Sequence, residues 1–185
     1  MKYCNLCGST VRFEIPSGDN RPRHICNHCG EIHYSNPKII AGCLPVYEDK
    51  VLLCKRDIEP RIGFWTLPAG YMENSESTRD AACRETLEEA NARVSNLQLY
   101  TLTSIVPVSQ VQMLYLAQLD DLNFSAGDET TDVQLFSEAD IPWDDLAFQT
   151  IKNALTFYFH DRKTGHFPLH HVDLTIPAGQ YVEKP

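Results

Sequence analysis

Three glutamates near the middle of the chain are spaced so that one helix would present them together. At about 100° per residue, Glu85, Glu88 and Glu89 fall within an arc of roughly 100°. Like charges one helical turn apart repel by about 0.2–0.5 kcal/mol, and a divalent cation would reverse that cost. Oxygen ligands that leave open positions suit Mg²⁺ or Mn²⁺ bound together with phosphate oxygens. A glutamate-rich helical face alone is more often solvated surface. Other residues must therefore decide between a metal site and a solvated face.

The segment that carries these glutamates has signals for both ends of a helix. Ser75 or Ser77 can accept hydrogen bonds from its first N–H groups, and Asn91 can adopt the left-handed conformation that ends it. We therefore predict a helix over residues 77–90. Its spacing predicts that the side opposite the glutamates faces a core, through Cys83, Leu87 and Ala90.

Four of the seven cysteines have the spacing of a zinc site. Two Cys-x-x-Cys pairs separated by eighteen residues fit a double zinc knuckle built from Cys4, Cys7, Cys26 and Cys29. The alternative is a pair of disulfides in a small oxidised domain, but nothing else in the sequence suggests secretion. The three other cysteines stand singly in apolar surroundings and are interpreted as small buried hydrophobes: Cys43, Cys54 and Cys83.

Charge divides the chain into two parts. The formal net charge is −9, yet residues 1–38 hold five Lys/Arg and three acids, which leaves eleven Lys/Arg and twenty-two acids, a net of −11, for the rest. We predict a zinc-binding module over residues 1–36 and a second domain over 37–185. An acidic surface repels a nucleic-acid backbone, so we expect no nucleic-acid partner. We also expect no membrane segment and a cytoplasmic location, because no long apolar run or apolar signal core appears.

Strands and a second helix are predicted around the glutamate helix. Residues 38–47 and 51–56 read as strands joined by a turn at 48–50. Residues 93–119 should hold two or three strands with a turn near Pro107, and residues 133–136 a short strand. Apolar residues at helical spacing over 144–162 predict the second helix.

The segment from Gly70 to Ala92 resembles the signature of the Nudix hydrolases. That signature is Gly, five residues, Glu, seven residues, Arg-Glu, an aliphatic, any residue, Glu-Glu, any residue, Gly and an aliphatic. Six positions match in register: Gly70, Glu76, Arg84, Glu85, Glu88 and Glu89. Three depart from it, with Thr86 at an aliphatic position, Asn91 in place of Gly and Ala92 as a small aliphatic. None of the three is a metal-binding position of the signature.

The resemblance implies a fold, a metal site and roles for individual residues. The fold is an α+β structure, a Nudix α/β/α sandwich around a mixed β-sheet, here over 37–185 and preceded by a small zinc ribbon over 1–36. It implies Mg²⁺ or Mn²⁺ held by Glu85, Glu88 and Glu89 with the Gly70 carbonyl, and structural Zn²⁺ on the four cysteines. Arg84 and Glu76 resemble an orienting salt bridge. Glu129, in the acidic loop before residues 133–136, is the candidate general base; the alternative is a solvated acidic loop.

A zinc ribbon ahead of a Nudix domain narrows the subgroup. NADH pyrophosphatases share this layout, but their Ser-Gln-Pro-Trp segment is absent. The segments His33–Lys38, Leu52–Arg56, Trp65–Tyr71 and Leu146–Phe148 are more similar to plant FAD and ADP-ribose pyrophosphatases and their bacterial relatives. This similarity implies hydrolysis of FAD to FMN and AMP, or of ADP-ribose to AMP and ribose 5-phosphate. The alternatives are an NADH pyrophosphatase, a nucleotide-pool cleaner and a non-catalytic ADP-ribose-sensing regulator.

Three residues are candidates for substrate contact. Arg56 is placed to reach a phosphate, and Trp65 or Tyr71 to stack on a base. Trp65 beside the motif is equally a core residue, and Arg56 a surface one. The expected partner is a nucleotide-diphosphate small molecule, and we expect a homodimer in which the zinc ribbon bridges subunits.

Overall fold

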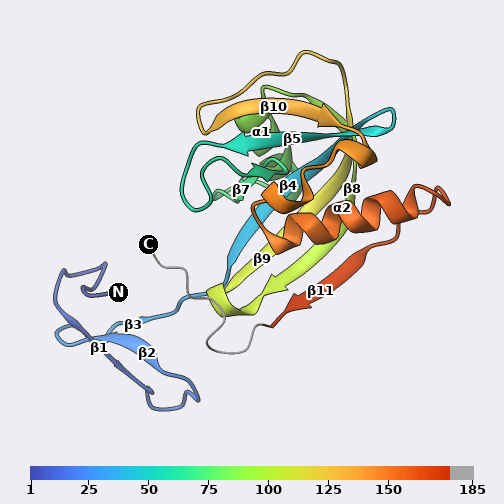
Figure 1. The fold of residues 1–185 in the computed structure, drawn as a ribbon. Coiled ribbons are helices and arrows are strands. Elements are labelled where there is room, and N and C mark those ends of the chain that lie inside the picture. The colour runs from blue at the N-terminus through green and yellow to red at the C-terminus, as the bar shows by residue number, and fades with distance from the viewer. Residues whose placement is uncertain (176–185) are drawn as a thin grey trace. The chain divides into compact units, whose positions relative to one another are not determined.

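The computed structural model describes residues 1–175. The chain divides into two compact units, Met1–Pro37 and the remainder from Lys38. The first unit holds a small antiparallel sheet of β1 (Val11–Glu14), β2 (Arg23–Cys26) and β3 (Ile32–His33). One Cys-x-x-Cys pair precedes β1, and the other connects β2 to β3. This unit is drawn in blue in Figure 1.

The second unit is built on a mixed sheet. Among the described residues its strands are β4 (Lys38–Tyr47), β5 (Lys50–Arg56), β6 (Trp65–Thr66), β7 (Ala69–Tyr71), β8 (Val94–Ile105), β9 (Gln110–Leu119), β10 (Thr130–Phe136) and β11 (His170–Leu174). They run in the order β10-β5-β4-β9-β8-β11, with β6 beside β5 and β7 beside β4. The β4–β9 and β8–β11 pairs are parallel, and the other pairs are antiparallel.

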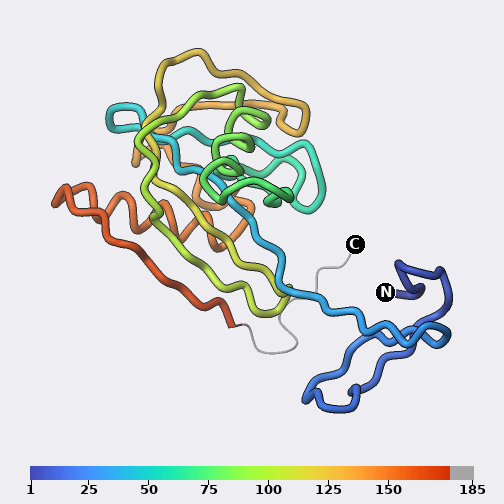
Figure 2. Tube along the Cα trace, turned by 180° about the vertical axis from the view of Figure 1, so that it is seen from behind, coloured from blue at the N-terminus to red at the C-terminus, as the bar shows by residue number. Residues whose placement is uncertain are grey.

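Two helices cover opposite faces of this sheet. Helix α2 (Gln149–Asp161) lies in front of the sheet in Figure 1, and α1 (Thr78–Ala90) lies in front of it in Figure 2, which is seen from behind. Short 3₁₀ turns occupy Val106–Val108, Glu138–Asp140 and Trp143–Asp145. The predicted Nudix sandwich around a mixed sheet, preceded by a small cysteine-rich ribbon, is confirmed. No helix within residues 1–175 is long and apolar enough to cross a membrane.

Local signals in the sequence set the ends of α1. Ser77 is the N-cap: its hydroxyl accepts from the backbone N–H of Asp80, whose carboxylate accepts from the Ser77 N–H in return. Ser77 rather than Ser75 therefore caps the helix. Asn91 ends it in the left-handed region at φ 48°. Both bounds of the predicted helix are confirmed.

The predicted core-facing side of α1 is wrong. Leu87 is 48% exposed and Cys83 only half-buried, whereas Glu85 and Glu89 are buried. The buried stripe consists of Ala81, Ala82, Glu85, Thr86, Glu89 and Ala90. Small alanines let the helix approach the sheet closely, and this approach carries the two glutamates into partly desolvated positions. Of the predicted core residues only Ala90 belongs to this stripe.

Other predicted elements need smaller corrections. The second helix begins at Gln149 rather than 144, because residues 143–145 form a separate 3₁₀ turn. The short strand predicted at 133–136 begins earlier, at Thr130. Cys43 and Cys54 are buried as predicted. Residues 93–119 form two strands, β8 and β9, with a 3₁₀ turn at Pro107.

Candidate functional site

Arg84 joins the acidic groups of the predicted motif. Its Nη2 donates to Glu76 Oε1 at 2.8 Å, and its Nη1 donates to Glu85 Oε1 at 2.7 Å and to Glu88 Oε2 at 2.9 Å. Nη2 also donates to the Tyr71 carbonyl at 3.1 Å. The hydrogen bonds from Arg84 lower the pKa of Glu76. The predicted Arg84–Glu76 pair is therefore present, within a network that orients two of the three motif glutamates.

Glu85 and Glu89 are acids in an environment that disfavours their charge. Burial raises the pKa of Glu89 to about 7, against the Ala69 N–H that donates to its carboxylate at 3.2 Å. Burial also raises the pKa of Glu85, despite its ion pair with Arg84. The negative charge of Glu129 raises both pKa values further. Glu88 differs because its side chain is 58% exposed.

The backbone of β7 lies directly against these carboxylates. A Cβ added at Gly70 would overlap the carboxylate of Glu85, so a larger residue at this position would displace that carboxylate. Two desolvated carboxylates against the β7 backbone, with the exposed Glu88 on the same helix, form a hard, negatively charged donor set that fits Mg²⁺ or Mn²⁺. The residues present thus suit the divalent ion that the motif implies.

The acidic loop after β9 is tied to the end of α1. The Ser125 N–H donates to the Ala90 carbonyl at 2.9 Å, and the Gly127 N–H to the Glu89 carbonyl at 3.0 Å. A Cβ on Gly127 would overlap the Glu88 carbonyl oxygen. These contacts satisfy carbonyls that a helix end leaves free. They also bring Glu129 close enough for its charge to act on the buried glutamates.

The three candidate substrate residues have different surroundings. Arg56 is half-buried, lies over the Phe148 ring at 5.2 Å and lowers the pKa of Glu89 by its positive charge. Tyr71 is 49% exposed, and the Lys38 ammonium lies 4.6 Å from its ring centre. Arg56 therefore lies near the acidic cluster, and Tyr71 lies on β7, the strand that contacts this cluster.

Trp65 is a core residue. It is 8% exposed, belongs to the apolar core beneath α2 and packs edge-to-face on Phe136 with ring centres 4.9 Å apart. The Lys55 ammonium lies over the Trp65 ring. The backbone carbonyl of Trp65 accepts a hydrogen bond from the Ala147 N–H at 2.8 Å. We therefore drop Trp65 from the stacking role that the sequence allowed, because its burial leaves little of the indole for a ligand.

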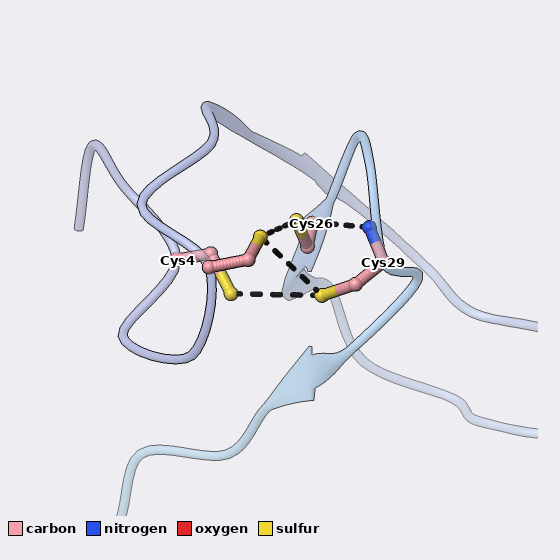
Figure 3. A group of neighbouring side chains, drawn as sticks. Cys4, Cys26 and Cys29 are labelled. Atoms are coloured by element: carbon pink, nitrogen blue, oxygen red, sulfur yellow. Dashed lines mark hydrogen bonds between the residues drawn. The ribbon is translucent and has the colours of Figure 1, made fainter.

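The four predicted zinc ligands converge in the first unit. Their Sγ atoms all lie within 4.8 Å of one another, and Figure 3 shows the labelled thiols turned toward a common centre. The Sγ separations of Cys7–Cys26, Cys7–Cys29 and Cys4–Cys29 are 3.4, 3.6 and 3.8 Å. A disulfide needs about 2.05 Å. Four sulfurs about 2.3 Å from a tetrahedral ion lie about 3.8 Å apart, so the geometry fits zinc.

Hydrogen bonds and charge in the thiol cluster also favour a cation. The N–H groups of Leu6 and His28 donate to Sγ of Cys4 and Cys26, each at 3.4 Å. Hydrogen bonds with Ser9 lower the pKa of Cys7 to about 6. Within residues 1–175, these four cysteines form the group of potential metal ligands whose ligand atoms lie within 4.8 Å of one another. Two of the motif glutamates instead accept hydrogen bonds from Arg84.

A groove elsewhere in the second unit holds none of the predicted site residues. Its volume is about 730 Å³, and it lies near the end of α2, lined among others by Gln98, Tyr158, Arg162 and Phe167. It is separate from the acidic cluster on α1.

Sequence reasoning missed the contacts that position the acidic loop. Gly127 lets the loop backbone contact the end of α1, where a side chain would overlap the helix backbone. The signal available was a lone glycine between acidic residues, which is compatible with any loop.

Comparisons with known proteins agree with the fold and the motif. A family model described as NUDIX domain matches residues 36–159, and one described as Nudix N-terminal, a zinc ribbon, matches residues 2–35. A crystal structure of a NUDIX hydrolase from Nitrosomonas europaea is 51% identical, with a TM-score of 0.91 over 94% of this chain and 99% of that chain.

Two further relatives are more distant. An NAD-capped RNA hydrolase NudC from Edwardsiella ictaluri is 30% identical over 75% of this chain and 50% of its own length, so the chain spans about half of that relative. The NUDIX domain of Shewanella oneidensis NrtR, solved with ADP ribose, shares the fold at 20% identity, with a TM-score of 0.60 over 72% of this chain and 91% of that chain. With its family model matched over most of its length, the chain belongs to the Nudix hydrolase family and carries that family's zinc-ribbon module at residues 2–35.

Proposed function

We propose that this chain is a divalent-metal-dependent pyrophosphohydrolase that cleaves the diphosphate bridge of a nucleoside diphosphate derivative. One observation carries the proposal: two buried glutamates of α1 face the backbone of β7, and Arg84 joins Glu85 to the exposed Glu88. Burying like charges is unfavourable unless a cation compensates them. The arrangement therefore makes sense as a binding site for a divalent ion.

Each side chain has a defined task in this proposal. When bound by Glu85, Glu88, Glu89 and the Gly70 carbonyl, Mg²⁺ or Mn²⁺ would polarise the phosphates and make a bound water more acidic. Glu129 accepts a proton from the attacking water, whose oxygen bonds to phosphorus as the bridging P–O bond breaks. Arg56 balances phosphate charge, and Arg84 with Glu76 keeps the carboxylates oriented.

We infer that FAD or ADP-ribose is the substrate. Support comes from the segments that resemble FAD and ADP-ribose pyrophosphatases, and from the zinc ribbon that precedes the catalytic motif. A second candidate is NADH or another NAD derivative, because relatives about 30% identical are named NAD-capped RNA hydrolases. All these molecules join adenosine to a second group through a diphosphate. A non-catalytic sensor of ADP-ribose is less favoured, because every motif carboxylate is in place.

A substrate panel tests this proposal. FAD, ADP-ribose, NADH and 8-oxo-dGTP are incubated with Mg²⁺ or Mn²⁺, and the products are separated by chromatography. We expect AMP from FAD or ADP-ribose. Glu88→Gln and Glu89→Gln should each lower kcat/KM by more than about 100-fold, above the 10- to 100-fold typical of residues that only support a metal site.

The control is Glu73→Gln, which neutralises an exposed acid just before the helix and should leave turnover unchanged. Equal turnover by the parent and both helix variants would contradict the metal-helix assignment. Preference for NADH over FAD and ADP-ribose would contradict the substrate inference alone. The homodimer remains a prediction, which light scattering on the intact protein can test.

A further inference from the structure

A row of side chains crosses the α2 face of the sheet and begins on β7, the strand whose other face contacts the acidic cluster of α1. Strand pairing aligns Tyr71 of β7 with Ile40 of β4, Ile40 with Gln112 of β9, and Gln112 with Thr103 of β8. Leu114, two residues after Gln112, lies in the core beneath α2. Side chains two apart on a strand share a face, so the row lies on the α2 side.

Two polar atoms in or next to this row have no partner. Gln112 is 5% exposed and Thr101 is 2% exposed. Within residues 1–175, Gln112 Oε1 and Thr101 Oγ1 are buried without a hydrogen bond. Thr101 pairs with Leu114, so it neighbours Gln112 diagonally across two strands. Buried polar atoms are almost always satisfied, so this pair calls for a ligand group or a water.

The exposure of the side chains falls along the row, which indicates the end from which a ligand would enter. Tyr71 is 49% exposed, Ile40 is half-buried, and Gln112 and Thr103 are buried. The Tyr71 hydroxyl accepts from Gln110 Nε2 at 2.9 Å, which holds the ring over this face. A flat molecule entering beside Tyr71 would cross Ile40 and meet the Gln112 amide.

The row and the acidic cluster share strand β7 but lie on opposite faces of the sheet, because successive side chains on a strand alternate. Tyr71 directly follows Gly70, which packs on Glu85, and the Ala69 N–H donates to Glu89. Gln112 lies two strands from Tyr71, about 10 Å away at the usual strand spacing. That separation is comparable with the span from the phosphates of a nucleotide to the far edge of its base.

We propose that Gln112 recognises the adenine of the substrate, a specificity role that rests on the proposed function. A glutamine amide can pair with adenine in two hydrogen bonds: its oxygen accepts from the N6 amino group, and its nitrogen donates to N7. Oε1, the atom left without a partner, is the acceptor that this pairing needs. FAD, ADP-ribose and NADH share adenine, so the contact selects their common half.

Binding of mononucleotides tests this assignment without any hydrolysis. The affinities of the intact protein for AMP and IMP are measured by calorimetry, since IMP has an oxygen in place of the N6 amino group. We expect AMP to bind about 5- to 150-fold more tightly, the range of one good two-bond base contact. Gln112→Met, which keeps the volume and removes the amide, should abolish this preference.

The control is Gln118→Met, at an exposed position farther along the same strand. It should keep the preference. Melting curves check that each variant folds; if Gln112→Met does not, Gln112→Asn shortens the amide by one methylene and should lose the preference too. A folded Gln112 variant that still prefers AMP would overturn the proposal and leave a buried water as the partner. A preference seen in a protein without turnover would uphold adenine recognition while contradicting only the hydrolase.

Discussion

At the scale of single residues, the proposed metal site places its glutamates in an environment that disfavours their negative charge. Glu89 is buried beside Glu85, and both feel the charge of Glu129. Arg84 pairs with Glu85 and Glu88, whereas the carboxylate of Glu89 accepts a hydrogen bond from the neutral Ala69 N–H. Without a divalent ion, such a group lowers the stability of the folded state.

Removing the charge of Glu89 should therefore stabilise the metal-free protein. In EDTA at pH 8, we expect Glu89→Gln to raise the free energy of unfolding by about 1–3 kcal/mol, because burial raises the carboxyl pKa. Urea denaturation measures this change. Glu88→Gln, at an exposed position, should shift it by less than about 0.5 kcal/mol. A loss of stability in Glu89→Gln would show that its carboxylate is already compensated.

A second buried acid, Asp161, differs from Glu89 because its surroundings favour the charged carboxylate. Asp161 of α2 accepts from the Tyr100 hydroxyl at 2.9 Å and pairs with His170 Nε2 at 2.7 Å. Burial raises its pKa, but these two hydrogen bonds outweigh burial and lower the pKa overall. A lowered folded-state pKa contributes stability above the ordinary value of 3.8, and this stability is lost as the pH falls through the folded-state value.

Tyr100→Phe tests this pH dependence. Loss of a hydrogen bond to a charged carboxylate should destabilise the protein by about 1–3 kcal/mol at pH 7. The deficit should diminish below pH 3.8, as the Asp161 carboxylate of the parent becomes protonated. Melting temperatures of parent and variant across this range measure it, with Tyr47→Phe as control. A deficit that is independent of pH would mean that the hydroxyl acts without the carboxylate.

At the scale of elements, a loop and a helix end position the candidate base. The N–H groups of Ser125 and Gly127 bind the last carbonyls of α1, and this contact requires glycine at 127. The loop is therefore fixed from one side by the helix that carries the proposed metal ligands. Any shift of this contact moves Glu129 relative to Glu85 and Glu89.

Gly127→Ala should disturb stability and turnover together. The added methyl would overlap the Glu88 carbonyl. We expect a loss of about 1–3 kcal/mol in the free energy of unfolding, typical of overpacking, together with a lower kcat. Urea denaturation and steady-state kinetics measure the two effects. Ala126→Ser, at the exposed neighbouring position, is the control, and normal kinetics in a destabilised Gly127→Ala would separate the loop from catalysis.

At the scale of the whole molecule, the two units have different sources of stability. The second unit has apolar core clusters on both faces of its sheet. The first has short strands and few buried apolar side chains, so metal binding must supply much of its folding free energy.

Zinc removal should therefore unfold only the first unit. We expect one zinc per chain by elemental analysis, and after chelation rapid proteolysis before Lys38 while the second unit stays resistant. Cys29→Ser should weaken zinc binding, whereas Cys83→Ser, outside the thiol cluster, should not. Protein without zinc but with disulfides among the four cysteines would contradict the metal assignment.

The sequence by itself determined the parts of this protein that depend on local spacing. The Cys-x-x-Cys pairs predicted the thiol cluster, and the register of Gly70, Glu76 and Arg84 with the glutamates predicted the family. Ser77 and Asn91 predicted the bounds of α1. Each of these depends on neighbouring residues along one turn or one helix, so tertiary packing had little freedom to alter it.

Only the tertiary structure decided which groups are buried. Helical periodicity placed Leu87 in the core, but the alanines of α1 pack on the sheet and carry Glu85 and Glu89 inward instead. Trp65 is buried because β6 lies beneath residues far along the chain. Gln112 acquires its position from strands paired across the sheet. Burial depends on contacts between segments that are distant in the sequence, and the spacing of residues along the chain does not specify those contacts.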